Sequence, residues 1–162
     1  MEEVLIIRKH DNIQKYSHRD KIVQLRRQGF WFGIPPQGYT YGIGDNGNRI
    51  LIRDPERFIF LRTMLKAIIY QTMSFGQIVQ RFDDEYMTPK RGDKGGVKIK
   101  SWFIIRRLLV NPAYAGLVPD IDNPNTYRIG KHEPMITIEE WKILLERLGM
   151  GRKFIIANDK TA

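Results

Sequence analysis

The sequence predicts a mainly helical domain with a minor β component, in which a helix-turn-helix-like pair accompanies one small β hairpin. Three capping signals, at Asp54, Ser74 and Thr137, each precede apolar residues that recur with helical period. The turn signal Asp45-Asn46-Gly47 lies between short runs of strand-forming residues, which is typical of a hairpin. A chain of 162 residues with 42% hydrophobic content can bury a core of its own, so we expect one compact domain.

The first 28 residues are expected to form a helical arm, because their few apolar residues follow helical spacing. The arm ends at Gly29, a residue suited to the position after a helix, with Arg26 and Arg27 in the last turn. Residues 29–41 combine aromatic residues with glycine and proline, a mixture that favours an extended, stiff linker.

Residues 42–150 are expected to form the main domain, which opens with the hairpin. The triplet Asp54-Pro55-Glu56 then predicts the start of a core helix, with the aspartate as N-cap and the proline in the first helical position. A capping box from Ser74 to Gln77 predicts a second, shorter helix that ends near Tyr86.

Residues 87–100 are rich in lysine, arginine and glycine and poor in apolar residues, so we expect an exposed loop or a small wing. Ser101 is expected to cap a helix that runs through Val110 and is stopped by Asn111-Pro112. The helices that begin at Ser74 and Ser101 therefore resemble a helix-turn-helix with an enlarged turn, the second helix being the candidate reader. A generic helical bundle is the alternative interpretation of the same pattern.

The C-terminal third predicts one further helix. After Ala113 the sequence is interrupted by prolines and indicates only possible short strands. Thr137 and Glu140 form a capping box, and the apolar residues behind it predict a helix that runs through Leu148. Residues 151–162 are expected to form a tail.

The charge balance suggests a polyanionic partner, and duplex DNA is the first candidate. The chain has 27 Lys and Arg against 18 Asp and Glu, a formal net charge of +9. Loop cations would neutralise phosphates, and the start of the helix at Ser101 could direct its backbone N–H groups and hydroxyl at a phosphate oxygen. Two arginines of that helix could reach a guanine edge, although solvation or phosphate contact is the commoner role. The candidate DNA-binding residues are Arg26, Arg27, Lys90, Arg91, Lys94, Lys98, Lys100, Ser101, Arg106 and Arg107.

Several other classes of function find no support in the sequence. The chain has no cysteine and only three scattered histidines, so we expect no disulfide, no metal site and no cofactor. Only Ser17, Ser74 and Ser101 are available as serine nucleophiles, and two of them stand where helix caps are expected. The run Asp83-Asp84-Glu85 could support a metal-dependent nuclease, but neighbours on a helix point in different directions, so a solvated face is the preferred interpretation. Without a signal peptide or a long apolar run, a cytoplasmic location at the bacterial nucleoid is expected.

Five segments in succession carry a resemblance to a known family. They are GFWFGIPPQGY, ILIRDPE, SFGQIVQRFDDEYMTPKRG, KSWFIIRRLLVNPAYAGL and HEPMITIEEWKILLERL. In this order and spacing, over about residues 12 to 148, they closely resemble the recombinase domain of large serine recombinases, which include phage integrases and transposon recombinases.

The resemblance implies a fragment of a larger enzyme. In the family, an N-terminal domain carries the serine nucleophile, a long helix leads out of it, and a zinc-ribbon domain follows the recombinase domain. The resemblance implies that residues 12–28 are the end of that helix, and that this chain by itself is no enzyme. It also implies recognition of an attachment site, with the linker in the minor groove and the helical core in the neighbouring major groove. We expect a monomer in isolation, with dimers or tetramers forming on DNA only as part of a full-length recombinase.

A protein-interaction or assembly domain is the competing hypothesis. In that case the aromatic residues 30–32 and the apolar residues 154–156 would dock on a partner protein, without sequence-specific DNA binding.

Overall fold

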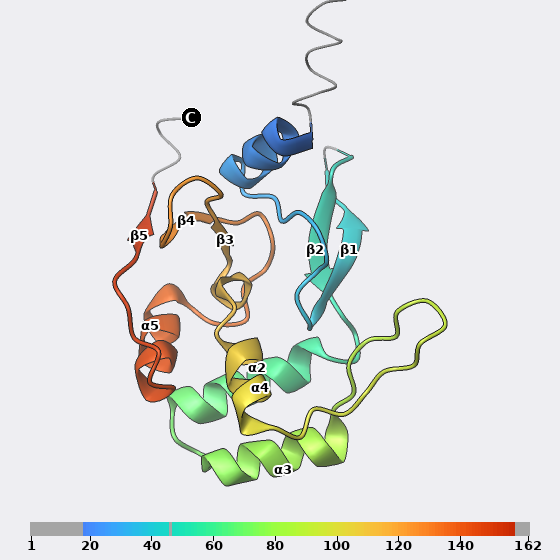
Figure 1. Cartoon of the computed structure of the whole chain (residues 1–162), viewed down its shortest axis with the longest axis vertical. Coiled ribbons are helices and arrows are strands. Elements are labelled where there is room, and N and C mark those ends of the chain that lie inside the picture. Colours follow the sequence, from blue (N-terminus) through green and yellow to red (C-terminus); the bar gives the residue numbers. More distant parts are fainter. Residues whose placement is uncertain (1–17, 46, 158–162) are drawn as a thin grey trace, which may run out of the picture.

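The computed structural model describes residues 18–45 and 47–157 of the chain, and in these ranges it is a mixed α+β fold. After the N-terminal arm, the helices are α2 (Phe58–Ile69), α3 (Phe75–Glu85), α4 (Trp102–Leu109), α5 (Ile138–Arg147) and the 3₁₀ helix η1 (Pro112–Ala115). The strands are β1 (Tyr39–Ile43), β2 (Arg49–Arg53), β3 (Leu117–Pro119), β4 (Thr126–Ile129) and β5 (Ile155–Ile156). Figure 1 shows α2, α3 and α4 at one end of the molecule, with the two small sheets toward the other.

The described part of the N-terminal arm is helical over residues 18–27, and the first 17 residues of the predicted arm lie outside the described ranges. The helix ends as predicted, because Gly29 takes a left-handed conformation with φ of +91° and Phe30 N donates to Leu25 O at 2.8 Å. The last three residues of the range 29–41 already belong to β1, which pairs antiparallel with β2 in the predicted hairpin.

The core lies where α2 packs against α5. The inner stripe of α2, with Leu61, Leu65 and Ile68, is almost completely buried, as are Trp141 and Leu144 of α5. Both capping boxes form as predicted, from Ser74 to Gln77 at the start of α3 and from Thr137 to Glu140 at the start of α5.

Helix α2 begins three residues later than predicted. The carboxylate of Asp54 accepts a hydrogen bond from Glu56 N at 2.9 Å, and residues 55–57 form a turn in place of the first helical turn. The helix therefore starts at Phe58, with Arg57 in the N-cap position.

The strand content is larger than the sequence predicts. Strands β3 and β4 pair antiparallel, and β5 adds to β4 in parallel, so two residues of the expected tail complete a second sheet. Phe154, just before β5, packs on Trp141 and Tyr127 with ring centroids 4.9 and 5.9 Å away. Phe154 and Ile156 both pack against the core. If residues 154–156 docked on a partner protein, these two side chains would therefore not be available for the contact.

Candidate nucleic-acid interface

The predicted basic loop folds as a hairpin-shaped wing, which comprises residues 88–97. At its neck, Thr88 N donates to Val97 O and Val97 N donates to the Thr88 hydroxyl oxygen, both at 2.9 Å. At its tip, Arg91 and Lys94 exchange two backbone hydrogen bonds of 3.0 Å, around Gly92 with φ of +57°. In Figure 1 the wing is the yellow-green loop that projects from the helices.

Arg57, at the start of α2, holds the base of the wing. Its guanidinium donates to Met87 O at 2.7 Å and to Thr88 O at 3.4 Å, and a third bond to the Asp54 carboxylate, 2.9 Å long, fixes its orientation. The sequence gives no signal for this role of Arg57, because no local pattern links residue 57 to a residue 30 positions further on.

The linker and the wing form the two walls of a cleft of about 630 Å³. Ile34, Pro35 and Gln37 line it from the linker, and the wing contributes cations. Gln37 is fixed in place, because its side-chain oxygen accepts from the Tyr86 hydroxyl and its backbone oxygen accepts from the Tyr114 hydroxyl at 2.7 Å. The structure therefore brings the predicted linker and the predicted basic loop together.

The wing cations differ in how far they are already engaged. Lys90, Arg91 and Lys94 are exposed, line the cleft, and make no side-chain ion pair within the described ranges. Lys98 instead donates to the backbone oxygen of Asp83 at 2.7 Å, and the amine of Lys100 lies 4.0 Å from the Asp83 carboxylate. Three of the five predicted loop cations are thus unengaged, and two border α3.

Helices α3 and α4 are in contact. Phe75 of α3 stacks on Trp102 of α4 with ring centroids 4.5 Å apart. Ser101 occupies the N-cap position of α4, but its side chain makes no capping hydrogen bond, which differs from the predicted cap. Ser101 is exposed at the end of the segment that follows the wing.

The two arginines of α4 occupy different environments. Arg106 is half-buried, donates to Leu148 O at 3.4 Å, and keeps its Nε buried without a partner in the described part of the chain. Arg107 is exposed. Of these two candidate DNA-binding side chains, Arg107 is therefore the more accessible to a ligand.

Arg26 and Arg27 lie beside the β3–β4 turn, away from the wing. Arg26 donates to Pro119 O at 3.4 Å and lies over the Trp31 ring, and burial lowers its pKa. Arg27 lies 3.8 Å from the Asp122 carboxylate, which Arg19 also contacts at 2.7 Å. These arginines form a second basic region that is partly neutralised by one aspartate.

Comparison with known proteins gives a likeness in fold to solved structures. No family model matches the chain, and no curated protein matches it. A chain of the solved structure described as "Crystal Structure of a LSR-DNA Complex", where LSR denotes large serine recombinase, has a similar fold with a TM-score of 0.56. The identity is 18%, over 82% of this chain and 39% of that chain. The two chains share a fold, and the present chain spans about two fifths of the length of the solved one.

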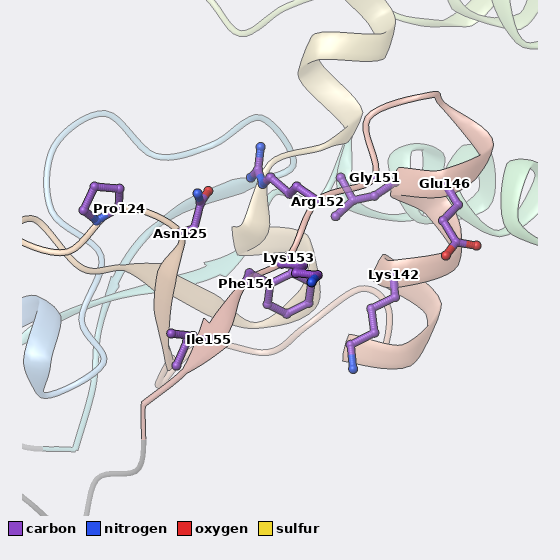
Figure 2. Close-up of a pocket in the computed structure, with 10 residues that line it drawn as sticks. Pro124, Asn125, Lys142, Glu146, Gly151, Arg152, Lys153, Phe154 and Ile155 are labelled. Atoms are coloured by element: carbon purple, nitrogen blue, oxygen red, sulfur yellow. The ribbon is translucent and has the colours of Figure 1, made fainter.

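A second hollow, of about 630 Å³, lies between α5 and the segment that leads into β5. Figure 2 shows Lys142 and Glu146 on α5, with Lys153, Phe154 and Ile155 on the facing segment. Arg152 at its edge is engaged with the Tyr127 hydroxyl at 2.7 Å. The hollow combines scattered charges with apolar walls and brings no nucleophile beside a base.

The acidic run on α3 does not gather into one site. Asp83 faces Lys100, Asp84 accepts from Gln80 at 3.0 Å, and Glu85 pairs with Arg81. Within residues 18–45 and 47–157, no group of three or more His, Asp or Glu side chains is placed to hold a metal ion. Over the same ranges, no helix has the length and apolar character needed to cross a membrane.

Proposed function

We propose that this chain is a DNA-binding domain that recognises attachment-site duplex for a site-specific serine recombinase, and that it carries no catalytic residue of its own. The observation that carries the proposal is the wing, on which Lys90, Arg91 and Lys94 project unpaired beside the linker cleft. The likeness in fold to a chain crystallised with DNA supports the same conclusion.

The chemistry of the wing suits phosphate binding. Cations that lack an internal partner do not have to break an ion pair before they meet a phosphate, and each phosphate contact releases condensed counterions. Gln37 of the linker lines the cleft beside the wing. Lys98 and Lys100, in the segment between the wing and α4, lie against Asp83 of α3. A duplex long enough to span the wing and this segment would also meet α4. Phosphate contacts would set the position of the duplex, and α4 would contact the bases.

The experiment is a titration of the full chain with duplex DNA at several salt concentrations. A triple variant, Lys90→Gln with Arg91→Gln and Lys94→Gln, removes the wing charges. The matched control, Lys131→Gln with Lys142→Gln and Lys153→Gln, removes three exposed charges outside the wing and α4. The expected slope of log affinity against log salt is smaller by about 3 in the wing variant, and close to that of the native chain in the control.

Two results would contradict the proposal. Affinity that does not depend on salt would exclude phosphate neutralisation as the basis of binding. An equal loss in the wing variant and the control would mean that net charge alone is responsible, with no localised interface.

A further inference from the structure

Helix α4 presents two large apolar side chains to solvent. Phe103 is 57% exposed and Ile104 is 53% exposed, whereas Ile105 and Leu109 of the same helix are fully buried. This helix has eight residues, and its buried side chains attach it to the core. The exposed pair, Phe103 and Ile104, has no packing role in the core. Neighbouring exposed apolar residues of this kind indicate a contact surface.

Cations flank this apolar pair along the chain. Arg107 follows it on the helix at a spacing of three or four residues, and Lys100, just before the helix, lies 4.0 Å from the Asp83 carboxylate; both side chains are exposed. The guanidinium groups of Arg106 and Arg107 each lie 5.8 Å from the Phe103 ring. An apolar centre with cations at both ends is complementary to a surface that carries apolar groups between two rows of anions.

We propose that Phe103 and Ile104 contact thymine 5-methyl groups in the major groove, while Lys100 and Arg107 meet the flanking phosphates. The major groove admits an α-helix, and the thymine methyl is the apolar group that it displays. Residues 102–109 read WFIIRRLL and include no Asn, Gln, Ser or Thr, the side chains that otherwise pair with adenine edges. Recognition of A·T pairs by this helix therefore depends on methyl contact. The inference rests on the proposed function and names the chemical group that the domain reads.

The test removes single methyl groups from the DNA. A preferred site is first selected by binding the full chain to a pool of random duplexes. Each thymine of that site is then replaced by deoxyuridine, which keeps the base pair and the phosphate charge and lacks only the methyl. For the native chain, the expected loss of affinity is about fourfold at each contacted position.

Protein variants assign that loss to α4. The double variant Phe103→Ala with Ile104→Ala is expected to bind thymine and deoxyuridine duplexes equally, with an unchanged salt slope. Phe103→Leu with Ile104→Val keeps an apolar surface and is expected to remain sensitive to the methyl, which guards against misfolding of the alanine variant. Ile121→Ala with Ile143→Ala removes exposed apolar side chains elsewhere and is expected to behave like the native chain.

The outcomes separate this inference from the proposed function. A selected site that binds tightly and is indifferent to deoxyuridine at every position overturns the methyl contact alone. Methyl sensitivity that persists in the alanine variant also overturns it, because another element then reads the methyl. A change of sedimentation from dimer to monomer in the alanine variant, with DNA binding unaltered, would make this face a protein interface. A pool that yields no preferred sequence, together with salt-independent binding, overturns both proposals.

Discussion

The backbone at Gly96 passes so close to Thr88 that a Cβ atom on residue 96 would overlap the Thr88 carbonyl oxygen. At the neighbouring Gly95, by contrast, an added Cβ would meet no atom within 4 Å. An alanine at position 96 therefore tests whether the wing neck must be closed. An alanine at position 95 tests only the effect of an added methyl group on the wing surface.

Gly96→Ala is expected to open the neck, because the carbonyl of Thr88 would have to move away. Forced overpacking of this size costs about 1–3 kcal/mol. DNA binding should weaken roughly tenfold, which corresponds to about 1.4 kcal/mol. Binding titrations of both alanine variants check this, and Gly95→Ala should match the native chain. Equal affinities for the two variants would mean that the shape of the wing does not matter for binding.

Arg57→Gln is expected to release the wing from α2, since two backbone oxygens and the Asp54 carboxylate lose their donor. Loss of charge-assisted hydrogen bonds of this kind costs about 2 kcal/mol. Amide exchange should accelerate over the wing more than in α5, as followed by hydrogen–deuterium exchange. Arg62→Gln, at an exposed position of the same helix, is the control. Unchanged exchange in the wing would show that Arg57 does not anchor it.

His132 is expected to make stability depend on pH just below neutrality. Burial lowers its pKa, the hydrogen bond to Ala113 O at 2.7 Å opposes this only in part, and Nδ1 is buried without a partner in the described structure. The unfolded chain therefore takes up a proton more readily than the folded chain. Stability should be constant above about pH 7 and fall as pH drops below about 6.5.

Urea unfolding at a series of pH values checks the role of His132. His132→Gln should flatten the profile between about pH 7 and 5. A native profile that is already flat in this range would contradict the prediction.

Glu140 is expected to stabilise the contact of α2 with α5 as a carboxylate. Burial by itself raises its pKa, but hydrogen bonds from Lys66, Thr137 N and Tyr70 outweigh it and lower the pKa to about 2. A folded pKa below the unfolded value means stabilisation that is present above about pH 5 and lost as pH falls from about 4.5 to about 2. Its size is on the order of 2–3 kcal/mol.

Glu140→Gln keeps the capping geometry and removes the charge, so it isolates this contribution. The variant should be less stable than the native chain at pH 7, and the difference should shrink as pH approaches 2. Urea unfolding at several pH values measures it. A difference that is the same at every pH would assign the loss to packing.

Local sequence signals predict the first residue of a helix correctly where both residues of the capping interaction lie within one turn. Ser74 and Gln77 are three residues apart, so their capping box needs no distant contact. At Asp54 two local structures compete for the same carboxylate, and the turn to Glu56 prevails over a helix cap.

The second sheet could not be predicted in the same way. Strand β5 pairs with residues 126 and 127, almost thirty positions earlier. Its short apolar sequence contains no pattern that indicates this pairing. The aromatic contacts of Phe154, which hold this segment on the core, are equally distant in sequence.

Of the candidate site, the sequence indicated which residues are charged and exposed but not which are already engaged. Lys98 and Lys100 meet Asp83 only because the wing returns beside α3. Arg106 and Arg107 are adjacent in sequence, yet only Arg106 reaches the end of α5, a consequence of how α4 is rotated on the core.

The closed neck between Thr88 and Val97 also affects the expected rate of association with a polyanion. A disordered loop has to give up conformational entropy on the order of 1 kcal/mol for each residue that becomes fixed on association. The wing is already folded before any encounter, so collisions need not wait for a folding step. The association rate should then follow long-range electrostatic attraction and decline with ionic strength, as expected for a rigid, charged projection.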